Sequence, residues 1–216
     1  MPRNKHPEET VKKILDVSLK LFLEKGYEQT TVLDIVDNLG GLTRGAFYHH
    51  FKSKEEVLEA IFGRQLAEND PFEKAKNAKV SNGLERVRLA FKLAVLSNVE
   101  SEQDFALSTL AVSLLANPRF LAEKIKSDQE TAKLVIPMIE EGMKDGSIKL
   151  GNSKLLADLF MLLVNFWMFP TLYPCNREEL QTKCSMITQI FESLGCPIID
   201  NELGQLLFDV FESLSW

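Results

Sequence analysis

Apolar residues recur at intervals of three and four positions along most of this chain, and no long stretch shows the alternation typical of a β-strand. The first such stripe lies in residues 8–25, after Pro7, which suits a helix start, and before Gly26, which suits a helix end. Its apolar face consists of Val11, Ile14, Leu15, Leu21 and Phe22. The pattern therefore predicts an all-α fold whose first helix spans about residues 8–25.

Three short helices are expected next, each marked by a capping signal. Thr31 with Asp34 can form a capping box at the start of the first, and Gly40–Gly41 ends that helix. Thr43 can cap the second helix, and Ser53 opens an S-x-x-E box at the start of the third. A helix, a glycine turn and a second short capped helix together form the helix-turn-helix unit.

A cationic strip lies in this part of an otherwise acidic protein. The chain has 31 acidic and 25 basic residues, a net charge of −6, yet residues 43–54 include no acid. If Phe47 and Phe51 point inward, the opposite helix face carries Arg44 and Tyr48. A helix fits the major groove of DNA, where an arginine near its start can bond a guanine edge. The strip therefore predicts a DNA-contact surface, although a solvated basic face would have the same composition.

The composition changes after residue 66. Residues 67–83 are polar, include Pro71, and are expected to connect two domains. We therefore expect a helix-turn-helix DNA-binding domain over residues 1–66 and a larger helical domain over residues 67–216. Helical patterns in the second domain lie near residues 84–98, 102–116, 119–145, 153–169, 177–194 and 202–214.

The N-terminal residues also resemble the DNA-binding domain of the TetR/AcrR family of bacterial transcriptional repressors. The matching motifs are TTVLDIVDNLG, TRGAFYHHF and KSKEEVLEAIF, and IPMIEEGMKDGSIK resembles the end of the family's long ligand-domain helix. The resemblance implies DNA contacts from Thr31, Thr43, Arg44, Gly45, Tyr48, His49 and Lys54. The chain departs from the family in LGGLTRG, a turn one residue longer than usual.

Two neighbouring apolar stripes run along residues 153–169. One consists of Leu155, Leu159, Leu162 and Phe166, and the other of Leu156, Phe160, Leu163 and Trp167. A helix that is apolar around most of its circumference is covered from more than one direction, by its own core or by a second subunit. The family resemblance implies a homodimer through the late helices, with Leu156, Phe160, Leu163, Leu207 and Phe211 as the expected interface.

The resemblance further implies a small-molecule cavity in the second domain. Candidate lining residues are Phe62, Phe91, Phe105, Met138, Trp167 and Met168, all of which could equally be ordinary core residues. Their chemistry favours an apolar or aromatic effector, and the acidic balance of this domain disfavours an anionic one. The expected partners are thus an inverted-repeat DNA operator, an unidentified small molecule and a second copy of the chain.

Other classes of protein lack support in the sequence. No nucleophile-elbow, phosphate-loop, zinc-protease or dinucleotide motif is present, and no histidine follows His50, which argues against an enzyme, a metal site or a cofactor. The three cysteines have no C-x-x-C spacing, and no signal peptide or membrane span is recognisable, so a cytoplasmic protein is expected. The alternative left open is a helical ligand-binding or scaffold protein that does not bind DNA.

Overall fold

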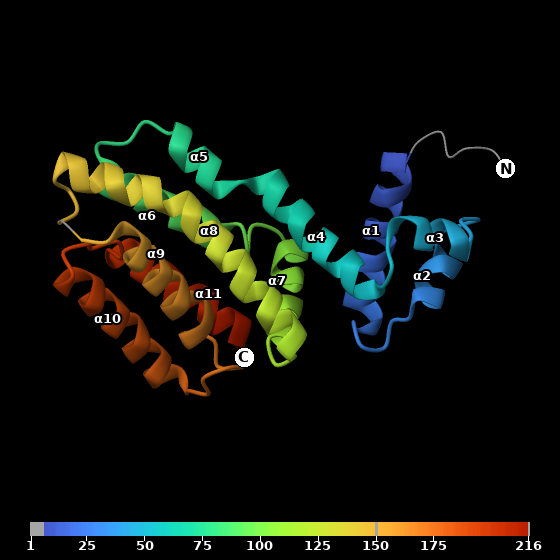
Figure 1. Cartoon of the computed structure of the whole chain (residues 1–216). Helices are drawn as coiled ribbons and strands as arrows, with labels where there is room; N and C mark the ends of the chain where they lie inside the picture. The colour runs from blue at the N-terminus through green and yellow to red at the C-terminus, as the bar shows by residue number, and fades with distance from the viewer. Residues whose placement is uncertain (1–6, 150, 216) are drawn as a thin grey trace. The chain divides into compact units, whose positions relative to one another are not determined.

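The computed structural model describes residues 7–149 and 151–215, apart from the side chains of residues 66–69 and 215. These residues form eleven α-helices and one π-helical turn, η1, and none of them lies in a strand, so the all-α prediction is confirmed (Figure 1). The elements are α1 (Pro7–Lys25), α2 (Val32–Asn38), α3 (Arg44–His50), α4 (Lys54–Asn69), α5 (Pro71–Asn77), α6 (Gly83–Leu96), α7 (Glu102–Leu114), α8 (Pro118–Asp145), α9 (Ser153–Leu162), η1 (Leu163–Trp167), α10 (Arg177–Ser193) and α11 (Asn201–Ser215).

The chain divides into two compact units, an N-terminal unit of residues 1–69 and a C-terminal unit of residues 70–216. The structure differs from the predicted elements in the expected connector, because α5 forms within it, and in residues 153–169, where η1 follows α9. Pro71 is the first residue of α5, and Asp70 caps the helix by accepting a hydrogen bond from the Glu73 amide at 2.9 Å. A proline favours the first helical position as much as a turn, and this helix is too short for a clear periodic pattern.

The core of the N-terminal unit lies where α1 packs against α4 and α2. The side chains at its centre are fully buried and come from all four helices: Ile14, Phe22, Ile35, Phe47 and Leu58. This core is what fixes α3, because the short α3 helix contributes only one fully buried side chain.

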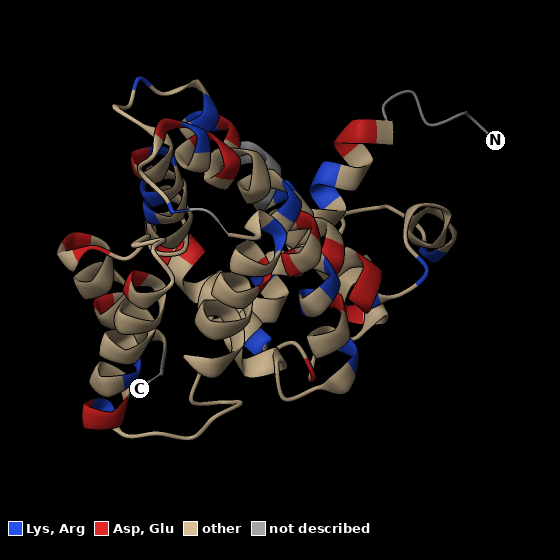
Figure 2. Ribbon diagram, turned by 60° about the vertical axis from the view of Figure 1, so that its left-hand side comes forward, with Lys and Arg blue, Asp and Glu red and all other residues tan. Residues whose placement is uncertain are grey.

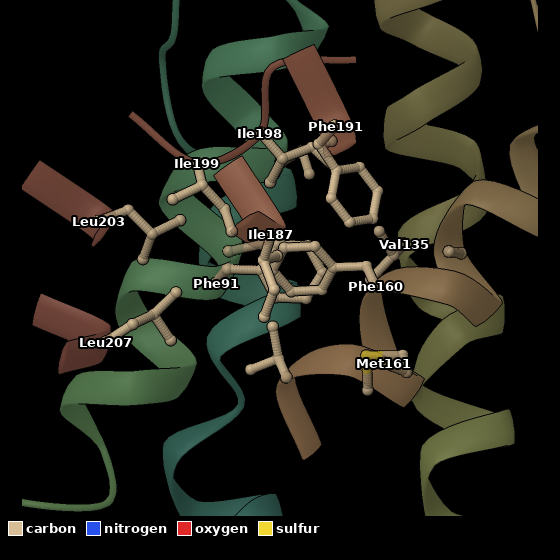
Figure 3. Close-up of a cluster of buried hydrophobic side chains, with 14 of the residues drawn as sticks. Phe91, Val135, Phe160, Met161, Ile187, Phe191, Ile198, Ile199, Leu203 and Leu207 are labelled. Carbon is tan, nitrogen blue, oxygen red and sulfur yellow. The ribbon is translucent and has the colours of Figure 1, made fainter. Parts of the chain in front are cut away.

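The C-terminal unit is built around α8, the longest helix, with α6 and α9 packed against it (Figure 1). Figure 3 shows three phenylalanines meeting in its core. Phe91 of α6 stacks on Phe160 of α9 with ring centroids 3.9 Å apart, and Phe160 meets Phe191 of α10 edge to face at 5.4 Å. Where α6 crosses α8, a Cβ atom on Gly83 would lie 2.1 Å from the Gly142 amide nitrogen, so the close crossing requires a glycine.

Arg86 ties three helices of the C-terminal unit together. Its guanidinium group donates to the carbonyl oxygens of Ala75 and Lys76 at the end of α5 and to that of Ala78 just beyond, each at about 2.9–3.0 Å. It also pairs with the Glu141 carboxylate of α8 at 2.8 Å. Because this side chain is mostly buried, one arginine satisfies carbonyl groups that the short helix leaves without partners.

Charged residues of both signs are interspersed along the helices (Figure 2). Within the described ranges, no single helix is both long and apolar enough to cross a bilayer. Only α7 and α8 taken together meet that condition by length and composition, and they are bent by 117° at the break between them.

Candidate nucleic-acid interface

The predicted capping box at the start of α2 is present. The Thr31 hydroxyl oxygen accepts from the Asp34 amide at 3.1 Å, and the Asp34 carboxylate accepts from the Thr31 amide at 2.8 Å. The same carboxylate pairs with Lys25 at 2.7 Å. Hydrogen bonds from Lys25 and Thr31 hold the pKa of Asp34 well below its usual range. Thr31 is exposed, but its hydroxyl group already serves this cap.

The turn between α2 and α3 depends on two consecutive glycines. Gly40 has φ 57° and Gly41 has φ 96°, both in the left-handed region that other residues adopt only at a cost. Leu39, just before them, is fully buried and anchors the end of α2. These two glycines therefore allow the backbone to make the turn between α2 and α3.

The short helix α3 combines a buried anchor with an exposed polar face. Thr43 caps it by accepting from the Ala46 amide at 3.2 Å, as the sequence predicts. Phe47 has no exposed surface. On the outer side, the Arg44 guanidinium carbon lies 5.5 Å from the centroid of the Tyr48 ring, a cation–π arrangement that aligns both side chains. The exposed residues are Arg44, Gly45, Tyr48 and His49.

Gly45 has no evident structural role within the chain. A Cβ atom added there would meet nothing closer than the Thr43 hydroxyl oxygen at 3.8 Å, an ordinary contact. A glycine in a helix costs about 0.5–1 kcal/mol relative to alanine, so its presence here needs another reason. An exposed glycine on this face leaves room for another molecule to come close to the backbone.

Lys54 holds the start of α4 against the turn after α1. Its ammonium group donates to the Tyr27 carbonyl at 2.7 Å and to the Glu28 carbonyl at 3.3 Å, and lies 4.3 Å from the centroid of the Tyr27 ring. Lys54 therefore contributes both positive charge and an internal tie. In the adjacent S-x-x-E signal, the Glu56 amide donates to the Ser53 hydroxyl at 3.4 Å.

Five of the seven residues expected at DNA thus lie together on α3 or its cap, while Thr31 and Lys54 lie at the starts of the flanking helices. The exposed surface of α3 itself contains a cation, a phenol and an imidazole but no carboxylate. These groups can donate hydrogen bonds to phosphate oxygens and base edges. The arrangement is chemically suited to a polyanion.

The residues expected to line an effector cavity do not surround a single space. Phe91, Met138 and Met168 are buried in the packed core, and Phe105 is exposed on α7. Phe62 belongs to the N-terminal unit and Trp167, partly buried, to the C-terminal unit. An open hollow of about 390 Å³ includes none of them; it is lined by Val80, Ser81, Asn82, Pro137, Glu141, Lys144 and Asp145.

The residues expected at a dimer interface are mostly internal. Four of them, Leu156, Phe160, Leu207 and Phe211, are buried in the core of their own subunit, and Leu163 is partly buried. The neighbouring apolar stripe faces outward instead, with Leu155 61% and Leu162 56% exposed. The two stripes start at adjacent residues of the same helix and have similar compositions. The sequence therefore does not show which stripe faces the core and which faces solvent.

Two buried charged residues were missed by sequence reasoning. Asp128 of α8 and Lys183 of α10 each occupy a position in an apolar stripe, three or four residues from buried neighbours, and that placement was the available signal. The Lys183 ammonium group donates to the carbonyl oxygens of Trp167 at 3.0 Å and Tyr173 at 2.9 Å, which satisfies the end of η1.

Comparison with known proteins identifies relatives of one kind. A family profile described as bacterial regulatory proteins, tetR family, matches residues 14–61. The HTH-type transcriptional repressor KstR2 of Rhodococcus jostii is 35% identical over 144 residues, 63% of this chain and 66% of that protein, so just under two thirds of it is spanned. The HTH-type transcriptional regulator TtgW of Pseudomonas putida is 34% identical over 48% of this chain and 73% of its own length.

The fold of the whole chain is also represented among solved structures. A TetR-family transcriptional regulator from Syntrophomonas wolfei superposes with a TM-score of 0.63 over 96% of this chain and 95% of that chain, at 18% sequence identity. At this identity the likeness concerns the fold alone. It extends the similarity beyond residues 14–61 to the helices of the C-terminal unit.

Proposed function

Because the chain belongs to the TetR family of bacterial regulatory proteins, DNA-binding transcription regulators rather than enzymes, we propose that it is a ligand-responsive repressor. In this proposal, a homodimer binds an inverted-repeat operator and a small molecule bound to the C-terminal unit releases it. The observation that carries the proposal is the exposed, acid-free face of α3, where Arg44 and Tyr48 stand side by side over the buried Phe47.

Each residue of this face has a role that follows from its chemistry. With α3 in the major groove, Arg44 bonds a guanine edge through its two-pronged guanidinium group. Thr43, Tyr48 and His49 donate to phosphate oxygens, and Gly45 lets the backbone approach the DNA. Lys54 adds positive charge at the start of α4, and Thr31 lies at the start of α2, where helix dipoles favour phosphate.

Substitution of Arg44 tests base recognition. Arg44→Ala is expected to cost about 1–3 kcal/mol of binding to the specific operator and to relax preference at one base position in each half-site. Lys52→Ala, the matched control, removes an exposed cation and should weaken specific and random DNA alike. Titrations at several salt concentrations measure both. An equal loss on specific and random DNA for Arg44→Ala contradicts base recognition by this residue.

We place the dimer surface on the outward stripe of α9 and the exposed side of α10. Phe160 packs on Phe191 while the Trp167 carbonyl accepts from Lys183, so the two helices run antiparallel. Exposed apolar residues follow this pair, with Leu155 and Leu162 on α9, Met186 on α10 and Leu194 just after it. A two-fold axis through such a self-complementary surface would give the paired N-terminal units the symmetry of an inverted repeat.

A charge placed on this surface tests the dimer. Leu162→Glu should give a monomer that keeps its helix content but loses operator affinity, because a buried carboxylate opposes association. Leu134→Glu is the matched control, since Leu134 of α8 is 52% exposed and lies outside the proposed surface. Sedimentation velocity at micromolar concentration distinguishes them. A monomeric wild type, or a Leu162→Glu protein that remains dimeric, contradicts the proposed surface.

Effector response requires that the ligand distinguish two states of the protein. A coupling free energy of about 1–3 kcal/mol between ligand and operator is typical of such regulators, and operator DNA must weaken the ligand by the same factor. Measuring ligand affinity with and without operator therefore tests the regulation independently of the ligand's identity. A ligand affinity that is the same with and without operator would contradict the proposed coupling between the two sites.

A further inference from the structure

Asp128 is a carboxylate in a place where the fold does not require one. It lies on the inner face of α8, only 6% exposed, in a stripe that continues through Ala132 and Val135. Its Oδ1 atom pairs with the ammonium group of Lys124, one turn earlier. Its Oδ2 atom is buried and has no hydrogen bond of ordinary geometry within the described part of the chain, although the side-chain amide of Asn165 lies near enough to lower the pKa of the carboxyl group. An unsatisfied buried acceptor is costly, so its retention needs a reason.

Residues of η1 lie next to this carboxyl group and its lysine partner. The π-helical turn closes with a hydrogen bond from the Met168 amide to the Leu163 carbonyl at 3.2 Å, and such turns are frequent at functional sites. It brings Asn165 near Asp128 and Phe166 beneath Lys124, whose Nζ atom lies 5.8 Å from the ring centroid.

The charge balance indicates what kind of molecule fits. Lys124 already compensates the charge of Asp128, so a cationic group at Oδ2 would bring an uncompensated positive charge into a buried place. An anionic group would meet the carboxylate directly. A neutral hydroxyl or amide N–H group satisfies Oδ2 without disturbing the pair.

We infer that Asp128 Oδ2 is the polar anchor of the effector site and accepts a hydrogen bond from a neutral donor on an otherwise apolar small molecule. This inference rests on the proposed effector response. It assigns a ligand class to the C-terminal unit that the aromatic residues alone leave open. Burial also raises the pKa of the Asp128 carboxyl, partly offset by Lys124, which is consistent with a group that benefits from a donor.

Paired probes that differ only in the donor test the anchor. The pairs are naphthol and methoxynaphthalene, phenylphenol and methoxybiphenyl, and adamantanol and methoxyadamantane. For wild type, calorimetry should show at least one alcohol binding about ten- to a hundredfold tighter than its methyl ether, as expected for a hydrogen bond to a charged group. Asp128→Leu should bind both members of that pair equally, and Asp128→Asn, which keeps one acceptor oxygen, should retain part of the difference.

Asp158→Asn is the matched control, because Asp158 pairs with Lys154 at the same i, i+4 spacing on the outside of α9. It should keep the full preference for the alcohol. The inference is overturned if no pair shows a preference in wild type, including the case in which no probe binds, or if Asp128→Leu keeps the preference. An internal water bound to Oδ2 would give the first of these results, since it would already supply the donor.

Parallel measurements of operator affinity separate this inference from the proposed function. If an alcohol binds through Asp128 without changing operator affinity, the anchor stands and the effector-responsive function fails. If a compound releases DNA equally from wild type and Asp128→Leu, the regulatory function stands and the anchor fails.

Discussion

The contacts that position the two candidate sites differ in range between the two units of this protein. In the N-terminal unit, the helices begin at caps three residues from their partners, as in Thr31 with Asp34 and Thr43 with Ala46. The helices of the C-terminal unit have caps of the same kind, but α5, α6 and α8 are also joined by contacts between distant residues, as in Arg86 with Glu141 and Gly83 with Gly142. The first kind of interaction is visible in a short sequence window, and the second is not.

Because of this difference, the candidate site of one unit can be recognised from the sequence and that of the other cannot. The candidate DNA surface of the N-terminal unit is a single short helix, so a motif of nine residues contains both the anchor and the exposed face. The candidate effector site of the C-terminal unit combines Asp128 of α8 with Asn165 of η1, which meet only after folding. A small recognition surface can thus be read locally, whereas a binding site inside a helix bundle cannot.

The largest expected effect compares equivalent core deletions in the two units. Phe47 and Phe160 are both at most 1% exposed, and replacing either with alanine should cost about 3–5 kcal/mol. Because the N-terminal unit has the smaller core, Phe47→Ala should unfold that unit and abolish DNA binding. Phe160→Ala should lower the stability of the C-terminal unit only. Hydrogen exchange resolved by segment measures both, and equal loss of protection in both units for Phe47→Ala would contradict their independence.

A second test breaks a long-range tie. Arg86→Met keeps an apolar stem but leaves the carbonyl groups at the end of α5 and the Glu141 carboxylate without their donor. The expected loss is about 2–3 kcal/mol of unfolding free energy in the C-terminal unit. Lys133→Met removes an exposed pair with Glu130 and should change stability by less than about 0.5 kcal/mol. Denaturant titration measures the two, and similar losses would remove the special role of Arg86.

A third test separates stability from recognition within the N-terminal unit. Lys54→Met removes the donor to the Tyr27 and Glu28 carbonyls, at an expected cost of about 1–2 kcal/mol to this unit, and weakens all DNA sequences alike. Arg44→Ala should leave stability nearly unchanged, because the side chain is exposed and no hydrogen bond or ion pair holds it within the described residues. Thermal unfolding and DNA titration of both variants check this. A stability loss for Arg44→Ala as large as that for Lys54→Met would contradict the division of roles.

The smallest effect concerns pH. The pKa of Asp34 is lowered by Lys25 and Thr31, and that of Asp145 is lowered by Ser147 and the Gly83 amide. A carboxyl group with a lowered pKa stabilises the folded state above its ordinary value of 3.8, and this contribution is lost as the pH falls below it. The advantage of wild type over Asp34→Asn should therefore shrink as the pH falls below 3.8.

The pH effect should also be confined to one unit. Asp34→Asn should affect the N-terminal unit and Asp145→Asn the C-terminal unit, because each carboxylate bonds only within its own unit. Melting curves from pH 3 to pH 7, resolved by unit, measure both differences. A difference that grew at low pH would contradict the assigned hydrogen bonds.

The sequence predicted the elements well wherever caps and periodicity agree, as for α1, α2 and α8. It missed α5, because Pro71 is compatible with both a turn and a first helical turn, and one buried face of Phe72 and Ala75 is too short to show a period. It could not choose between the two stripes of α9, since both contain large apolar residues and only the neighbouring helices decide which one is covered.

The candidate site residues were also predictable only where local sequence determines which way a side chain faces. The exposed side of α3 was predictable because Phe47 must face inward, which fixes Arg44 and Tyr48 on the outside. Asp128 was not predicted, because its burial depends on its pairing with Lys124 and its proximity to η1, which only the folded structure shows.

The two left-handed glycines before α3 have a practical consequence for building chimeric repressors. In a relative with a shorter turn, the recognition helix leaves α2 after fewer residues, so its rotation about its own axis differs from that of α3 here. Grafting only the exposed side chains of α3 onto such a scaffold would aim them at different base pairs. The portable unit is the whole block of residues 39–54, which includes Gly40, Gly41, the Thr43 cap and the Phe51 anchor. A chimera that receives the whole block should acquire the operator preference of this protein, and a chimera that receives only part of the block should not.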